Sequence, residues 1–173
     1  PPVSDATIRD LELEGSMSDV RIGVIGGSGL YAMEGLEVEQ ERRIRTPWGE
    51  PSDAYVIGRL DGRRVAFLAR HGRGHKLLPT ELNFRANVYG FKQLGVEFLI
   101  SVSAVGSMKK EYAPGHIVVP DQFFDRTRHR PDTFFGNGLV GHVSLAPPVS
   151  AALAGVLHAA AKAERATVHM GGT

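Results

Sequence analysis

The sequence contains no cysteine, which excludes disulfide bonds and thiolate metal sites. This absence fits a reducing compartment, and we expect a cytoplasmic protein. Acidic and basic residues nearly balance, and the formal net charge of +1 argues against a general affinity for nucleic acid or an acidic membrane. No run approaches the roughly 18 consecutive apolar residues of a membrane span. We therefore expect small-molecule partners, and no nucleic acid or membrane.

Both ends of the chain carry information about its organisation. The first sixteen residues lack the basic start and apolar middle of a signal peptide, and Gly15-Ser16 before Met17 is typical of a cloning junction. We expect residues 1–16 to be a tag or a disordered leader. Residues 168–173 lead toward a further strand, and a sheet rarely leaves such an apolar edge uncovered. With no internal repeat or low-complexity linker, we expect residues 17–173 to form the N-terminal part of a single, longer domain.

Short apolar runs alternate with helical patterns along the chain. Residues 21–25 predict a buried strand, and Asp61-Gly62 between residues 54–60 and 63–69 predicts a hairpin, because both central residues of such a turn need positive φ. This alternation predicts an α/β fold with a mixed, twisted sheet flanked by helices. Further extended segments are expected at residues 36–44, 96–102 and 116–119.

Two segments carry a helical pattern. The first is expected to begin with Thr80 as its N-cap, to bury Phe84, Val88 and Phe91 on one face, and to end at Gly95. The second is alanine-rich and is expected to begin with Ser150 as its N-cap. Its inward positions are expected to be Leu153, Val156, Leu157 and Ala160.

A glycine-rich loop follows the first predicted strand. Residues 27–32, Gly-Ser-Gly-Leu-Tyr-Ala, match the G-x-G-x-x-A variant of the dinucleotide fingerprint, but that interpretation needs a helix at the loop. Only Met33 and Glu34 separate this loop from Gly35, and the residues after Gly35 have an extended pattern, so there is little room for that helix. A P-loop is excluded because no Gly-Lys-Ser/Thr follows. Two interpretations remain beside the dinucleotide: a turn without a ligand, or a cradle of N–H groups and the Ser28 hydroxyl for a small oxyanion such as phosphate.

Basic residues gather where another apolar strand ends. Arg70 and His71 lie at the C-terminal end of residues 63–69, where α/β sheets place their ligands, and a guanidinium fork suits phosphate oxygens. We expect Arg73 and Lys76 to be solvated. A metal site at His71 and His75 would need a helix to align the two rings, and the intervening glycines argue against one.

A third apolar strand ends in small residues with hydroxyl groups. Ser103 and the Ala104 amide follow residues 96–102. If this strand end converges with Ser28 and with Arg70 and His71, the four side chains and the amide define an anion site without a metal. The loops taken singly do not decide between this site and ordinary turns.

Five motifs occur in order along residues 21–173. They are Val24–Gly29, Thr46–Gly49 with Pro51–Asp53, Ala69–Arg73 with His75, Ser103–Ser107, and Asp121–Phe123 leading to Asp125–Thr127 and Arg130-Pro131. Together they resemble the methylthioadenosine phosphorylases within the trimeric purine nucleoside phosphorylase family. The resemblance implies the fold of that family, with residues 17–173 as the N-terminal part of one nucleoside phosphorylase domain, and a homotrimer.

The resemblance also implies roles for individual residues. It implies that phosphate is bound by Ser28, Arg70, His71, Ser103 and the Ala104 amide. Val102 stands where the family often has a threonine, so one hydroxyl of the motif is missing. His142 matches a histidine that reaches the 5′ substituent from a neighbouring subunit, although Ser144 replaces a frequent proline. The family's purine-binding residues, including the general acid, lie beyond Thr173.

The activity implied by the resemblance is phosphorolysis of 5′-methylthioadenosine to adenine and 5-methylthioribose 1-phosphate. Phosphate is then a co-substrate that attacks the anomeric carbon, and no metal or organic cofactor is needed. The alternatives are a general purine nucleoside phosphorylase acting on inosine, guanosine, adenosine or methylthioinosine, and a non-catalytic module that binds a nucleotide or NAD.

Overall fold

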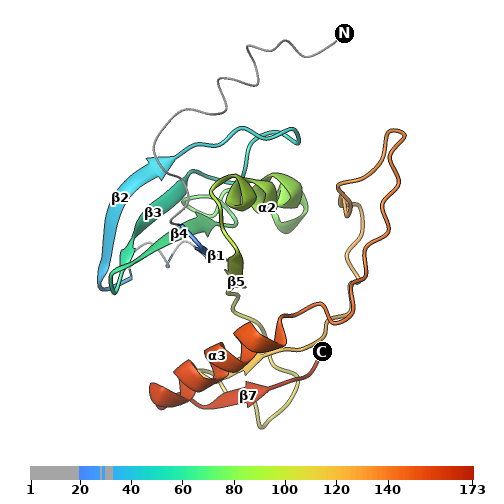
Figure 1. Cartoon of the computed structure of the whole chain (residues 1–173). Coiled ribbons are helices and arrows are strands. Elements are labelled where there is room, and N and C mark those ends of the chain that lie inside the picture. The colour runs from blue at the N-terminus through green and yellow to red at the C-terminus, as the bar shows by residue number, and fades with distance from the viewer. Residues whose placement is uncertain (1–19, 28, 30–32) are drawn as a thin grey trace. The chain divides into compact units, whose positions relative to one another are not determined.

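The computed structural model describes residues 20–27, 29 and 33–173. They form two compact units, one ending at Ser103 and the other beginning at Ala104. The first unit holds a five-stranded sheet in the order β2-β3-β4-β1-β5 (Figure 1). Its strands are β1 (Ile22–Gly26), β2 (Leu36–Arg42), β3 (Tyr55–Leu60), β4 (Arg63–Ala69) and β5 (Phe98–Ser101). The α/β prediction with a sheet of mixed direction is therefore confirmed, although β5 is shorter than the predicted segment.

Three neighbouring strands of this sheet run in the same direction. β1 pairs in parallel with both β4 and β5, and the register places Gly26 beside Ala69 and Ile25 beside Ser101. The chain therefore leaves all three strands at one edge of the sheet. Each of the three predicted anion-binding segments begins at this edge.

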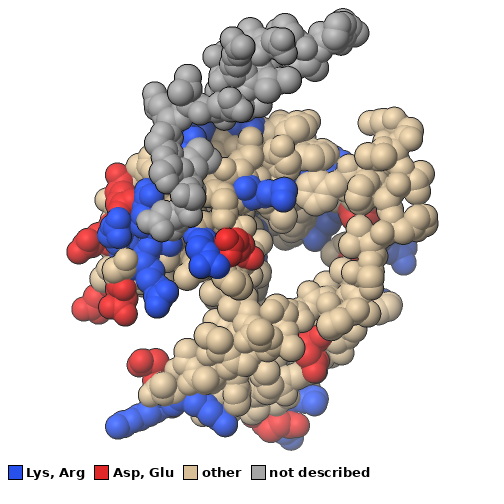
Figure 2. All heavy atoms as spheres, in the orientation of Figure 1, with Lys and Arg blue, Asp and Glu red and all other residues tan. Residues whose placement is uncertain are grey.

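The other strand pairs are antiparallel. β3 and β4 form the predicted hairpin, in which Asp61 and Gly62 have φ values of 49° and 74°. β2 pairs with β3, and Glu39 lies at an irregularity in the β2–β3 pairing. Its carboxylate contacts Arg59 and Arg64 at 2.8 and 2.9 Å. Figure 2 shows acidic and basic side chains side by side over β2, β3 and β4, so this end of the sheet is charged without a strong excess of either sign.

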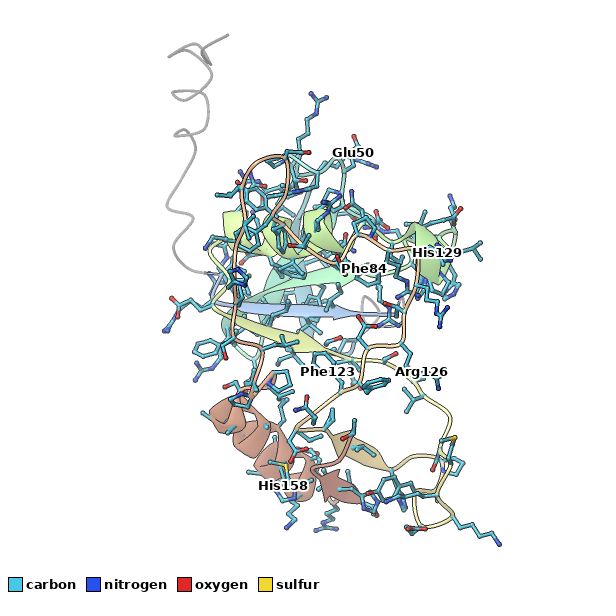
Figure 3. All side chains as sticks on the ribbon, turned by 90° about the vertical axis from the view of Figure 1, so that its right-hand side faces the viewer. Glu50, Phe84, Phe123, Arg126, His129 and His158 are labelled. Carbon is cyan, nitrogen blue, oxygen red and sulfur yellow. The ribbon has the colours of Figure 1, made fainter. Side chains whose placement is uncertain are left out.

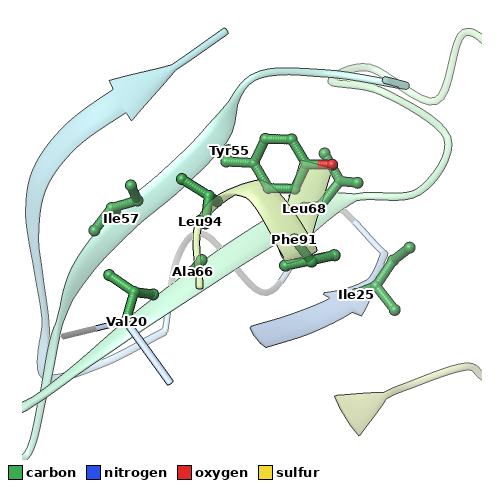
Figure 4. Close-up of a cluster of buried hydrophobic side chains, with 8 residues drawn as sticks. All are labelled: Val20, Ile25, Tyr55, Ile57, Ala66, Leu68, Phe91 and Leu94. Carbon is green, nitrogen blue, oxygen red and sulfur yellow. The ribbon is translucent and has the colours of Figure 1, made fainter. Parts of the chain in front are cut away.

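Helix α2 (Phe84–Gln93) contributes to the main core of the first unit. Phe91 and the following Leu94 pack with Tyr55, Ile57 and Leu68 in one buried cluster (Figure 4). The Tyr55 and Phe91 rings meet edge to face with centroids 4.9 Å apart. A second cluster contains Val56, Val65 and Phe67, which alternate in sequence with the residues of the first and so face the opposite side of the sheet.

The predicted start of this helix is wrong, and its predicted buried face is confirmed only at Phe91. Pro79–Glu81 form a short 3-10 turn, η2, and α2 begins after Asn83, whose side chain accepts a hydrogen bond from the Ala86 N–H. Val88 is exposed and Phe84 only partly buried. The buried positions are Ala86, Asn87, Gly90 and Phe91. A stripe of large apolar residues does not reveal the small buried positions of this helix, such as Gly90, where an added Cβ would overlap the Tyr55 ring.

The second unit is built around two short parallel strands, β6 (Ile117–Val119) and β7 (Val168–Met170), and helix α3 (Ala151–Ala163). Ser150 caps α3 as predicted, accepting from the Leu153 N–H at 3.3 Å. The predicted inward face is wrong for Val156 and Ala160, which are exposed, and Leu153 and Leu157 are only partly buried. Two strands of three residues present little surface for a helix to cover, and Ala154 is the residue of α3 that is buried.

Between β6 and α3 the second unit consists mainly of irregular chain. Figure 3 labels Phe123, Arg126 and His129 in this segment, and His158 on α3. Gly136 and Leu139 form an isolated bridge within it. Across both units, the described residues contain no helix with the length and apolar character needed to cross a membrane.

Candidate functional site

The structure places two of the predicted strand ends directly against the third. The Arg70 N–H, immediately after β4, donates to the Gly26 carbonyl at the end of β1 with a distance of 2.8 Å. On the other side of β1, the Val102 N–H donates to the Ile25 carbonyl at 2.9 Å. Because parallel strands deliver their carboxyl ends to one edge, Arg70 and Ser103 flank the chain that leaves β1.

The guanidinium of Arg70 joins two of the predicted site residues. Its Nη2 donates to the Ser103 Oγ at 3.2 Å, and its Nε donates to the His71 Nε2 at 3.2 Å. A hydroxyl group and a guanidinium cation therefore meet at the shared edge. Both groups donate hydrogen bonds to oxyanions, and the charge of the guanidinium strengthens such bonds.

The imidazole of His71 is oriented by the backbone. Its Nδ1 lies 2.8 Å from the Leu77 carbonyl oxygen. Because a carbonyl can only accept, this contact assigns the proton to Nδ1, which leaves Nε2 as the acceptor for Arg70. His71 thus holds the guanidinium of Arg70 from one side while Ser103 contacts it from the other.

Residues 70–77 form a compact glycine-containing turn. Gly72, Gly74 and His75 all have positive φ, at 70°, 76° and 54°. The turn stacks the rings of His71 and His75 with centroids 4.4 Å apart, while the two ring nitrogens of His71 contact Arg70 and the Leu77 carbonyl. Among the residues described, no three His, Asp or Glu side chains form a group that could hold a metal ion.

Arg73 and Lys76 are exposed, as predicted. The Arg73 guanidinium is nevertheless not free in solvent, because its Nη2 contacts the Glu41 carboxylate on β2 at 2.8 Å. Its side chain is about half exposed, and a surface pair of this kind contributes little to stability.

The turn is supported by Asp53, Ser52 and Asn87, which are not among the site residues predicted from the sequence. The Asp53 Oδ2 accepts a hydrogen bond from the Arg73 N–H at 2.7 Å. Ser52 donates its N–H to the Asn87 Oδ1 at 2.8 Å and accepts from the Asn87 Nδ2 at 2.9 Å. Asn87 is fully buried in α2. Ser52 and Asp53 belong to the segment of residues 43–54 between β2 and β3, which we call the connector. Its Pro-Ser-Asp run does not show from the sequence which distant backbone group the aspartate will bind.

Asn87 also fixes the start of β3 through its own backbone. The Tyr55 Oη donates to the Asn87 carbonyl at 2.7 Å. Burial raises the pKa of this phenol well above its usual range.

Asn83 secures the other end of the connector, because its Nδ2 donates to the Trp48 carbonyl at 2.7 Å. Figure 3 labels Glu50 of this connector and Phe84, the first residue of α2.

The contacts described above do not test three of the predicted site residues. Ser28 lies outside the described residues. Ala104 directly follows Ser103 and opens the second unit. His142 lies in the irregular chain of that unit and is exposed there. The roles of these three residues stay predictions.

Comparison with known proteins shows the family to which this chain belongs. The family model described as the phosphorylase superfamily matches residues 21–173. The chain belongs to the phosphorylase superfamily. The match includes β1, β4 and β5 and every residue of the candidate site.

Individual relatives of this phosphorylase-superfamily chain share much of its sequence. It is 63% identical over 153 residues to an S-methyl-5′-thioadenosine phosphorylase of Geobacter sulfurreducens, covering 88% of this chain and 54% of that protein. It is 61% identical over 152 residues to an enzyme of the same name from Koribacter versatilis, covering 88% and 52%. The chain thus spans about half the length of these curated relatives.

Solved structures confirm the predicted nucleoside phosphorylase-like fold. A methylthioadenosine phosphorylase from an antarctic soil metagenomic library is similar with a TM-score of 0.83 and 47% identity, over 89% of this chain and 54% of that one. A methylthioadenosine phosphorylase of Schistosoma mansoni in complex with adenine gives a TM-score of 0.77 and 37% identity, over 84% and 54%.

Proposed function

We propose that the full-length protein catalyses the phosphorolysis of 5′-methylthioadenosine to adenine and 5-methylthioribose 1-phosphate. The observation that carries this proposal is the contact of the Arg70 guanidinium with the Ser103 hydroxyl at the common edge of β4, β1 and β5. The substrate is supported by the relatives named as phosphorylases of that nucleoside, which are up to 63% identical. Phosphate is the co-substrate, and the proposed reaction uses no metal or organic cofactor.

In this reaction a phosphate oxygen forms a bond to the anomeric carbon as the bond from that carbon to the purine nitrogen breaks. The sugar passes through a state with oxocarbenium character, and the phosphate dianion stabilises its positive charge. The protein needs no nucleophile of its own. It must hold the dianion in line with the breaking bond, and fixed donors achieve this by positioning and electrostatics.

We assign the positioning of phosphate to Arg70 and Ser103, together with the Ser28 hydroxyl and the Ala104 amide, and to His71 acting through the guanidinium of Arg70, because both ring nitrogens of His71 already have partners. Arg70 is suited to this role because Ser103 and His71 hold its guanidinium at the edge where the three strands end. The departing purine accepts a proton at N7, and we assign that proton donor to no residue among 1–173. His142 is proposed to line the pocket for the 5′ substituent, from a neighbouring subunit of a homotrimer in the cytoplasm.

The test is to incubate the purified full-length protein with 5′-methylthioadenosine in the presence and absence of inorganic phosphate. We expect adenine release to require phosphate and to yield an equal amount of methylthioribose 1-phosphate. Equal cleavage without phosphate would identify a hydrolase. Faster turnover of adenosine or inosine would identify a general purine nucleoside phosphorylase. No turnover, with thermal stabilisation by NAD but not by phosphate, would identify a dinucleotide-binding module.

A further inference from the structure

We infer that Asp53 is a positioning residue for the phosphate site, acting on Arg70 and His71 through the backbone of Arg73. This inference rests on the proposed function. The hydrogen bonds and the ion pair of Asp53 go to Ala54 and Arg73, so its effect on Arg70 and His71 passes through the turn of residues 70–77. The structure supports this route at each step.

Both oxygens of the Asp53 carboxylate accept hydrogen bonds from backbone N–H groups. Oδ2 accepts from Arg73 at 2.7 Å, and Oδ1 accepts from Ala54 at 2.8 Å. The side chain is only 15% exposed. Hydrogen bonds to a charged acceptor are stronger than those between neutral groups, and shielding from water strengthens them further. Asp53 therefore holds the backbone at Arg73 firmly.

Asp53 is itself fixed to the core of the first unit. The preceding residue, Ser52, exchanges two hydrogen bonds with the fully buried side chain of Asn87. The backbone of Ser52 also lies against the turn, since a Cβ added to Gly72 would come within 3.2 Å of the Ser52 carbonyl. The connector is thus anchored in α2 on one side and faces the turn on the other.

The turn transmits the position of Arg73 to the two site residues because it is internally closed. The His71 carbonyl accepts from the N–H groups of both Lys76 and Leu77, at 3.0 and 3.1 Å. The Leu77 carbonyl in turn meets the His71 Nδ1. One end of the turn is tied to β1 through the Arg70 N–H, and its middle is tied to Asp53. Releasing the middle removes one of these two ties, so the turn can shift and carry with it the His71 ring, which contacts the Arg70 guanidinium through Nε2.

The side chain of Arg73 takes a different direction from its N–H. Its guanidinium pairs with Glu41 at 2.8 Å, and its Nε is 3.9 Å from Asp53. Asp53 therefore acts through the hydrogen bond from the backbone N–H of residue 73, which any residue other than proline at that position could donate. This difference provides matched controls.

The test compares the variants Asp53→Asn, Arg73→Ala and Glu41→Gln in the full-length protein. An amide offers one acceptor oxygen where two N–H groups point, so Asp53→Asn must lose one bond. We expect it to raise the KM for phosphate roughly tenfold or more while the KM for the nucleoside changes little, because a small displacement of positioning groups costs this much. Arg73→Ala and Glu41→Gln keep the backbone bond and should retain the phosphate KM of the unaltered protein.

A binding measurement separates positioning from general loss of stability. Inorganic phosphate should raise the Tm of the unaltered protein. Asp53→Asn should need a higher phosphate concentration for the same rise in Tm, in proportion to its weaker binding of phosphate. If Asp53→Asn does not fold, Asp53→Glu keeps the charge but moves the acceptors by one methylene, and the same split of KM values is expected.

An unchanged phosphate KM in Asp53→Asn, or an equal rise of both KM values, would overturn the inference. So would a rise in phosphate KM in Arg73→Ala as large as that in Asp53→Asn, because the side chain would then carry the effect. The proposed function fails by a different result, namely that the unaltered protein cleaves the nucleoside without phosphate.

Discussion

The guanidinium of Arg70 and the hydroxyl of Ser103 lie 3.2 Å apart although 33 positions separate them in the sequence. Neither residue is in a strand, and each follows the end of one. They meet because β4 and β5 both run parallel to β1 and flank it. The topology of the sheet thus brings together the groups on which the proposed phosphate site depends.

Replacing Arg70 with alanine is expected to lower kcat/KM for phosphate by roughly 10²- to 10³-fold, as removal of one preorganised donor does elsewhere. The guanidinium is the charged group that contacts both His71 and Ser103, so its loss removes charge and orientation together. Steady-state kinetics with varied phosphate measures the effect. Arg73→Ala serves as the control, because that guanidinium pairs with Glu41. Equal losses in both variants would contradict the assignment.

The strand ends could be predicted from the sequence because each is marked by an apolar run that stops at polar or small residues. This signal predicts Arg70, His71 and Ser103, and the parallel register of β4, β1 and β5 brings them together. The same signal predicts Ser28, which lies outside the described residues. That these strand ends lie at one edge depends on the pairing of β1 with β4 and β5, which are distant in sequence. Local sequence patterns do not encode such pairing.

Other features could not be predicted because their partners are backbone atoms. Nothing in the sequence indicates that the Leu77 carbonyl orients His71 or that Asp53 accepts from the Arg73 N–H. The buried face of α2 could be predicted only in part for a related reason. Large apolar residues mark Phe91, but the helix also buries Asn87, whose side-chain polar atoms pair with Ser52.

Replacing Asn87 with alanine is expected to lower the free energy of unfolding by roughly 2–4 kcal/mol, because two hydrogen bonds are lost and the Ser52 N–H is left without its partner. Urea-induced unfolding of the full-length protein measures this change. Ser52→Ala removes only the hydroxyl and should cost about 1 kcal/mol. Similar stabilities for Asn87→Ala and the unaltered protein would show that the connector is not anchored through this residue.

Stability should fall at alkaline pH through Tyr55. Burial raises the pKa of its phenol above the value of the unfolded chain, so the unfolded state loses a proton that the folded state keeps. The contribution is fully present below about pH 10 and declines above it, by up to about 1.4 kcal/mol per pH unit.

The variant Tyr55→Phe isolates this effect. It should be less stable than the unaltered protein at neutral pH, because the hydrogen bond to the Asn87 carbonyl is lost. Above about pH 10 its free energy of unfolding should fall less steeply than that of the unaltered protein. Unfolding curves collected across this range give both slopes, and parallel slopes would rule out Tyr55 as the titrating group.

The account depends on an oxyanion being held where the chain leaves β4, β1 and β5. A crystal structure of the full-length protein grown with inorganic phosphate tests this most directly. We expect phosphate within hydrogen-bond distance of the Arg70 guanidinium and the Ser103 hydroxyl, beside the end of β1. Phosphate bound at another place while this edge holds only water would contradict the account.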